Sequence, residues 1–196
     1  RGDHLMANEF GVTAWGRAWL RTVERTAASG PNPSLPTART LARNGSVEFT
    51  VVSSGTVVAE VSTKAKTSSV TIGVPLWTKS EIAAVKSLLR SAGKANRSVS
   101  TGELPDSIVT ELQARNIAVA VDLSECTASC DCSGRRSPCV HHLAAIYALA
   151  GRIDEEPAVA VTLRSAPVKA GKKSTSTHSA EWIPLSDIDI RSFYGD

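Results

Sequence analysis

Three cysteines and one histidine lie close together in the sequence with the spacing of metal ligands. Cys130 and Cys132 flank one residue, six residues follow, and Cys139 and His141 then flank another single residue. Three thiolates and one imidazole at such short spacings are the ligand set of a closed structural zinc site. We therefore predict that these four residues bind Zn²⁺ as the cofactor.

Two nearby residues are alternative ligands. His142 lies three residues after Cys139, which is also a reachable ligand position on a helix, and Cys126 is a further thiol on the same stretch. The alternative to a metal site is catalysis, either with Cys139 and His141 or His142 acting as a thiol–imidazole pair, or with Cys130 and Cys132 acting as a redox pair. A metal ion would occupy these thiols, and the sequence shows no other acid–base constellation, Gly-rich phosphate loop or nucleotide signature. We therefore do not expect an enzyme.

The backbone must change conformation between the two halves of the ligand set. Residues two apart diverge by roughly 200° around a helix, so Cys139 and His141 cannot both lie well inside one. The pair Ser137-Pro138 is typical of a helix start, and apolar residues follow at helical spacing between Leu143 and Ala150. The sequence predicts a helix that begins only after Cys139.

This stretch resembles the SWIM zinc finger, named for SWI/SNF-type ATPases and MuDR-type transposases. The resemblance rests on the C-x-C-x6-C-x-H pattern and on the segment PCVH (138–141), which runs directly into LAAIY (143–147). A second, less specific match is FGVTAWGRAW (10–19), which looks like the tryptophan-rich opening of bacterial, mainly actinobacterial, SWIM proteins, with Ala14 in place of a tryptophan. Together the matches bracket roughly residues 10 to 163 of the chain. The resemblance implies contact with DNA or with proteins, and a helicase-like SWI/SNF-type ATPase as partner.

Composition sets limits on the other functions. With 42% hydrophobic residues the 196-residue chain can bury a core, while a net charge of +3 permits nucleic-acid binding without requiring it. No run approaches the roughly 18 apolar residues of a membrane span. Residues 1–5 look like a cloning remnant before Met6, and clustered cysteines without a secretion signal favour a reducing, cytoplasmic location.

The remaining patterns predict one α+β domain with appendages. A first helix is capped by Thr13, and three alternating runs around residues 47–51, 57–61 and 70–74 form a small antiparallel three-stranded sheet packed by helices. Further helices begin at the capping box of Thr78 and near Pro105, with a short strand over 117–121. After the zinc knuckle we expect Gly151 to end the finger helix and Asp154 to cap a last helix. The expected boundaries are 1–9 (remnant and extension), 10–125 (α+β domain), 126–164 (zinc finger and following helices), 165–179 (flexible linker) and 180–196 (apolar tail).

Basic residues mark a candidate phosphate-binding surface. Arg135 and Arg136 lie in the loop between the ligand pairs, so they either contact nucleic acid or balance the charge of the zinc–thiolate centre. Lys64 and Lys66 follow the second strand and form either a phosphate-facing surface or a solvated rim.

The tail after the linker is apolar enough to dock onto a protein surface. Its candidate docking residues are Trp182, Ile188, Ile190, Phe193 and Tyr194, and Asp187 to Ile190 alternate as an added edge strand would. The surface onto which this tail docks belongs either to a partner protein or to the chain's own domain. We expect a zinc-binding adaptor that contacts DNA or a helicase-like partner, with a purely structural protein–protein module as the alternative.

Overall fold

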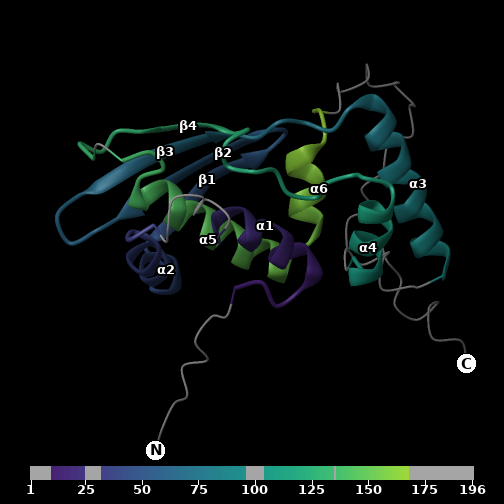
Figure 1. Ribbon diagram of the computed structural model, residues 1–196, viewed down its shortest axis with the longest axis horizontal. Coiled ribbons are helices and arrows are strands. Elements are labelled where there is room, and N and C mark those ends of the chain that lie inside the picture. Colours follow the sequence, from purple (N-terminus) through teal and green to yellow (C-terminus); the bar gives the residue numbers. More distant parts are fainter. Residues whose placement is uncertain (1–9, 25–31, 96–103, 135, 168–196) are drawn as a thin grey trace, which may run out of the picture.

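The described part of the chain is built around an antiparallel sheet (Figure 1). The structure is a computed structural model that describes residues 10–24, 32–95, 104–134 and 136–167. Within these residues the sheet has four strands in the order β1-β2-β3-β4. The strands are β1 (Val47–Ser53), β2 (Thr56–Ser62), β3 (Thr67–Gly73) and β4 (Thr127–Cys130). The α+β architecture is confirmed, but the expected three-stranded sheet gains a fourth strand, which leads into the cysteine cluster.

The first hairpin has the backbone that its sequence requires. Ser54 and Gly55 both have positive φ, at 41° and 79°, which is the pattern of the tight turns whose twist matches antiparallel strands. The expected alternation in β1 fails at Val51, however. An irregularity in the β1–β2 register between Phe49 and Val51 shifts the phase, so Val51 is 40% exposed.

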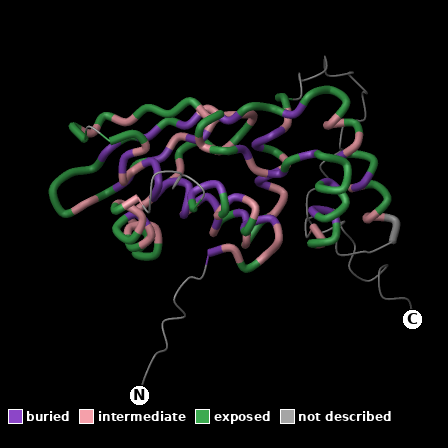
Figure 2. The backbone as a smooth tube through the Cα atoms, viewed as in Figure 1, coloured by how far each residue is buried: buried purple, intermediate pink, exposed green. Residues whose placement is uncertain are grey.

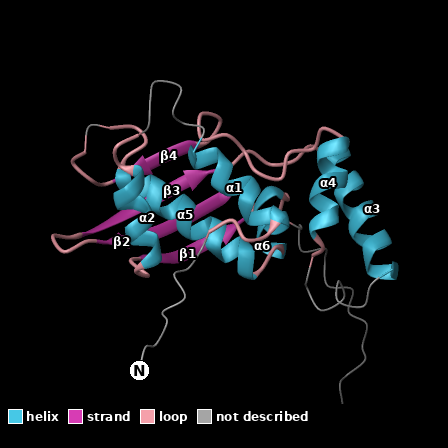
Figure 3. Cartoon of the chain, turned by 60° about the horizontal axis from the view of Figure 1, so that its bottom comes forward, coloured by secondary structure: helices cyan, strands magenta, loops and turns pink. Residues whose placement is uncertain are grey.

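Six helices complete the described residues. They are α1 (Ala14–Glu24), α2 (Leu35–Arg43), α3 (Lys79–Ala95), α4 (Asp106–Ala114), α5 (Val140–Glu155) and α6 (Ala158–Arg164). The long α5 runs along the sheet, and α1 and α2 pack against it, whereas α3 and α4 pair with each other at one end of the molecule (Figures 1 and 3). None of the described helices is both long and apolar enough to cross a bilayer.

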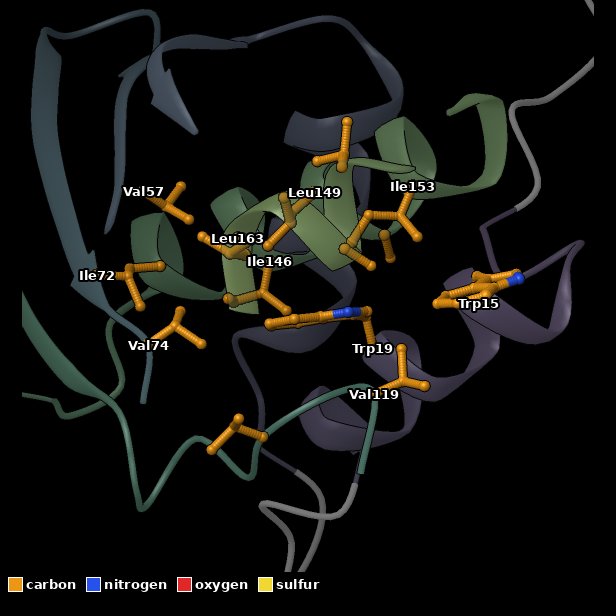
Figure 4. Packing of buried hydrophobic residues seen from close by; sticks show 14 of the residues in the cluster. Trp15, Trp19, Val57, Ile72, Val74, Val119, Ile146, Leu149, Ile153 and Leu163 are labelled. Carbon is orange, nitrogen blue, oxygen red and sulfur yellow. The ribbon is translucent and has the colours of Figure 1, made fainter. Parts of the chain in front are cut away.

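The core lies between the sheet and the helices, and α5 is its central element (Figure 2). All residues of α5 from His142 to Tyr147 are buried, and the helix packs against the sheet, α1 and α2. Trp15 and Trp19 of α1 are fully buried, and Figure 4 shows the Trp19 ring among side chains of α5 and Val119. The expectation that these tryptophans pack in the core is confirmed.

The local signals of the two outer helices are also confirmed. Thr78 N–H donates to Glu81 Oε2 at 2.7 Å and Glu81 N–H donates to Thr78 Oγ1 at 3.3 Å, which is the reciprocal bonding of a capping box. Pro105 directly precedes α4. Residues 117–121 form no strand, but Ile117 and Val121 are buried, so the alternation predicted the burial correctly and the pairing wrongly.

Asp154 caps a helix other than the one expected. The helix α5 continues through Gly151 to Glu155, and Asp154 lies within it. Its carboxylate accepts bonds from the Gly11 N–H at 2.7 Å and from the Thr13 N–H and hydroxyl at 2.8 and 2.7 Å. Gly16 permits this approach, because a Cβ there would collide with the carboxylate. One side chain of α5 thus ties down the start of α1.

We expect Asp154→Ala to destabilise the domain by about 2 kcal/mol, because three donors lose a charged acceptor. The matched control is Glu155→Ala, one residue later on an exposed position of the same helix. Urea unfolding of both variants measures the difference. Equal midpoints would show that the start of α1 does not depend on this carboxylate.

Candidate metal centre

The four predicted ligand residues converge in space. Cys130 ends β4, Cys132 follows two residues later, Cys139 is the N-cap of α5, and His141 lies in the first turn of that helix. One ligand atom from each residue lies within 4.8 Å of those of the other three. The predicted helix start after Cys139 is confirmed, because α5 begins at Val140.

The interatomic distances agree with a tetrahedral centre. Ligand bonds of about 2.3 Å to sulfur and about 2.0 Å to nitrogen place a sulfur and a nitrogen roughly 3.5 Å apart across a tetrahedral angle. Cys130 Sγ and His141 Nδ1 are 3.7 Å apart. The cluster therefore has both the donor atoms and the dimensions needed to hold a metal ion.

Pairing of β4 with β3 fixes the first half of the ligand set. Cys130 lies opposite Val70 in this register. Asp131 adds two bonds beyond the strand: its N–H donates to the Ser69 carbonyl at 3.2 Å, and its carboxylate accepts the Ser69 N–H at 3.1 Å. Because Asp131 stands between two ligands, these bonds hold both Cys130 and Cys132 at the edge of the sheet.

Burial and hydrogen bonding treat the ligands differently. Burial raises the pKa of the Cys130 thiol to about 12. The Gly134 N–H bond lowers the pKa of Cys132, which favours its thiolate. Burial lowers the pKa of His141 and so keeps its imidazole neutral, as a metal ligand must be. The positive charge of a bound dication would stabilise the thiolate form of Cys130, which burial otherwise disfavours.

The two alternative ligands lie outside the cluster. Among the described residues, the group that could hold a metal contains neither His142 nor Cys126. His142 is only 8% exposed and faces a separate cavity that Cys126 also lines. Burial raises the pKa of Cys126 to about 11, which leaves its thiol protonated at neutral pH and a poor nucleophile.

A basic hollow borders the ligands. It has a volume of about 480 Å³ and is lined by the ligands Cys132 and His141 together with Lys66, Arg136 and Ser34. The Lys66 ammonium donates to the Asp131 carbonyl at 3.4 Å and lies 4.0 Å from its carboxylate. Thus Lys66, which the sequence places with the sheet, lies beside the metal ligands, and Arg136 is exposed there.

The other predicted site residues lie outside the described residues. These are Arg135 in the ligand loop and the tail residues Trp182, Ile188, Ile190, Phe193 and Tyr194. Sequence reasoning also missed Asp131 as the residue that fixes the first ligand pair. Its position between Cys130 and Cys132 was the available signal, but the bond to Ser69 depends on the pairing of β4 with β3.

Comparison with known proteins shows one distant homologue. The chain is 28% identical over 147 residues to the uncharacterized protein Rv2102 of Mycobacterium tuberculosis, an alignment that covers 74% of this chain and 52% of that protein. The chain therefore spans about half the length of the curated relative that it matches. No protein-family model matches the chain. No solved structure matches it.

Proposed function

We propose that the cluster is a structural zinc centre of the SWIM type. Three thiols and one imidazole converging on one point are the donor set that zinc favours over the harder cations Mg²⁺ and Ca²⁺. The resemblance of residues 130–147 to the SWIM pattern supports the same assignment. The bound ion would supply charge neutralisation for the thiolates, and the protein residues supply the geometry.

The centre would join two parts of the fold. Cys130 and Cys132 come from the edge of the sheet, whereas Cys139 and His141 come from the start of the core helix α5. Ligation would hold the loop of residues 133–138 between two fixed ends. A long side chain such as Arg136 then projects from a rigid backbone, which reduces the entropy lost when it binds a partner.

The protein would act as a non-enzymatic accessory factor of nucleic-acid transactions, beside a helicase-like ATPase. The observation that carries this proposal is the basic hollow, in which Lys66 and Arg136 flank the metal ligands with the hydroxyl groups of Ser34 and Ser133. Lysine, arginine and hydroxyl side chains are the usual contacts to phosphate. The second candidate is a module that zinc stabilises and that contacts only proteins. The exposed loop between the ligand pairs would be sufficient for such a contact, without any binding of phosphate.

A salt titration tests the phosphate contact. Lys66→Ala combined with Arg136→Ala should weaken binding to duplex DNA of any sequence about equally, and should reduce the slope of log affinity against log salt by about two. Adding Arg135→Ala should reduce it by about one more. Gel-shift titrations from about 50 mM salt upward measure the slope.

The matched control removes two lysines from a distant exposed surface. Lys79 and Lys86 lie on α3, which packs with α4 away from the metal centre. Their replacement by alanine lowers the net charge equally but should leave the slope unchanged. If the wild-type chain has no affinity for DNA at about 50 mM salt, the protein-only candidate replaces the nucleic-acid proposal.

A further inference from the structure

A second cavity adjoins the finger and shares no lining residue with the basic hollow. It has a volume of about 720 Å³, within the range of ligand-binding pockets. Its walls come from the sheet (Ile72 and Ala128), from α5 (His142 and Ile146) and from the loop of residues 122–126. It therefore opens where the core helix meets the last strand of the sheet.

The cavity presents one unpartnered buried side chain, His142, in a wall that combines apolar residues with Asp122, Ser124 and Ser137. His142 is 8% exposed, and neither of its ring nitrogens has a hydrogen-bond partner among the described residues. A neutral imidazole offers one donor and one acceptor, which a single amide group can match. The lining contains no Lys or Arg, so the cavity does not favour an anion. A peptide segment with an apolar side chain fits this chemistry.

The neighbouring strand has an open edge. In the described sheet β4 is the terminal strand and pairs with β3 alone. Asp131 bonds back to Ser69 of β3, so the alternate residues Ala128 and Cys130 direct their backbone groups away from the sheet. An open edge of this kind is a template for one more strand.

The two faces at this edge differ in polarity. On the side of the cavity, Ala128 lies opposite the buried Ile72. On the outer side, the exposed residues of the paired strands are hydroxyl-bearing, namely Ser69, Thr71, Thr127 and Ser129. The exposed Asp131 follows β4 on the same side, and its carboxylate accepts the Ser69 N–H and lies 4.0 Å from the Lys66 ammonium. An added strand that alternates apolar residues with hydrogen-bond acceptors would match both faces. The segment Asp187-Ile188-Asp189-Ile190 of this chain has that alternation.

The described chain ends near this edge. Arg164, the last residue of α6, donates to the Pro75 carbonyl, two residues beyond the Gly73 that pairs with Thr127 of β4. The guanidinium of Arg164 is also close enough to Cys126 to oppose, in part, the rise that burial causes in the pKa of that thiol. About twenty residues separate Arg164 from Asp187, and at roughly 3.3 Å per residue they can reach any point along β4.

We propose that residues 187–190 bind in cis along the open edge of β4, with Ile188 and Ile190 directed into the cavity beside His142 and with the two aspartates on the hydroxyl-bearing face. Of the two docking places that the sequence leaves open for this tail, the structure offers a matching surface on the chain's own domain. The proposal goes beyond the proposed function, because it requires an intact metal centre to hold β4 but no contact with nucleic acid.

The thiol of Cys126 reports on the occupancy of the cavity. It lines the cavity and lies outside the metal cluster, while its raised pKa keeps the thiol mostly protonated. Iodoacetamide should therefore modify it slowly but measurably at alkaline pH in zinc-loaded protein, while the three ligand thiols stay protected. Ile188→Asp combined with Ile190→Asp should raise the modification rate by about tenfold, because the opened cavity admits the reagent. The amide of Ala128 should exchange faster with solvent in the same variant. Ile183→Asp, the same substitution outside the docked segment, should change neither rate.

Truncation and rescue make the test independent of that variant. Removing residues 180–196 should raise both rates, and adding a synthetic 180–196 peptide should lower them again, while zinc content and the salt dependence of DNA binding stay unchanged. Rates that are equal in the full and truncated chains would overturn the proposal. Protection that disappears on dilution would also overturn it, because the occupant would then be the tail of a second copy.

Discussion

Replacing either Cys132 or His141 by alanine should abolish stoichiometric zinc binding and unfold at least residues 126–150. Apparent binding energies of structural zinc sites are roughly 10–16 kcal/mol, comparable with the total stability of a domain. The loss should spread further than the finger, because α5 begins at this centre and packs against the sheet and against α1. Elemental analysis of reduced, chelator-free protein and circular dichroism measure the two effects.

The alternative ligands provide the controls. Cys126→Ala should retain one equivalent of zinc, since this thiol lies outside the cluster, and His142→Ala should do so as well. Less than about half an equivalent in the unmodified protein would rule out the zinc assignment. Loss of zinc in His142→Ala but not in His141→Ala would show that the ligand register is wrong.

The metal cluster was predictable because its information is local. The spacing of Cys139 and His141 excludes a continuous helix, and a proline directly before Cys139 marks where the helix can begin. Because only a short loop separates the two ligand pairs, they can come together without depending on long-range contacts. The order of the first three strands was predictable for a similar reason, since short connections such as Ser54-Gly55 leave antiparallel pairing as the simple outcome.

Elements defined by tertiary contacts were not predictable. The strand β4 reads Thr-Ala-Ser-Cys, and three of its four residues are exposed, so it lacks the apolar alternation of a strand and exists because β3 pairs with it. The nine-residue helix α2 differs, because Leu35, Ala38 and Ala42 recur at helical spacing and pack against the core, so its sequence does carry a local signal. What no local pattern records is its partner, since the packing of α2 against α5 is a long-range contact.

Gly151 shows how a correct local rule can fail. Glycine commonly follows the last turn of a helix, yet here it lies inside α5. A Cβ at this position would stand 3.1 Å from the Phe10 ring, so the glycine gives an aromatic side chain close access to the helix. The contact joins residues more than 140 positions apart in the sequence. The rule detected an unusual glycine but could not distinguish packing from termination.

Trp19→Ala should destabilise the domain by about 3–5 kcal/mol, which approaches the whole stability of a marginal protein. The side chain is fully buried, and Figure 4 shows it among side chains of α5 and Val119. Alanine would leave a large cavity where α1 packs on α5, and a rigid helix pair closes such a cavity only in part. Trp19→Phe should cost less, because it keeps an aromatic ring and leaves a smaller void.

The control for Trp19 is an exposed apolar residue next to the same helix. Val12 is 61% exposed, so Val12→Ala should change the free energy of unfolding by less than about 0.5 kcal/mol. Denaturant unfolding with zinc present compares the three variants, and zinc content confirms that the metal centre remains loaded. A Trp19→Ala variant as stable as the wild type would mean that α1 does not help to hold α5, and that the sheet, α2 and the metal centre hold that helix without it.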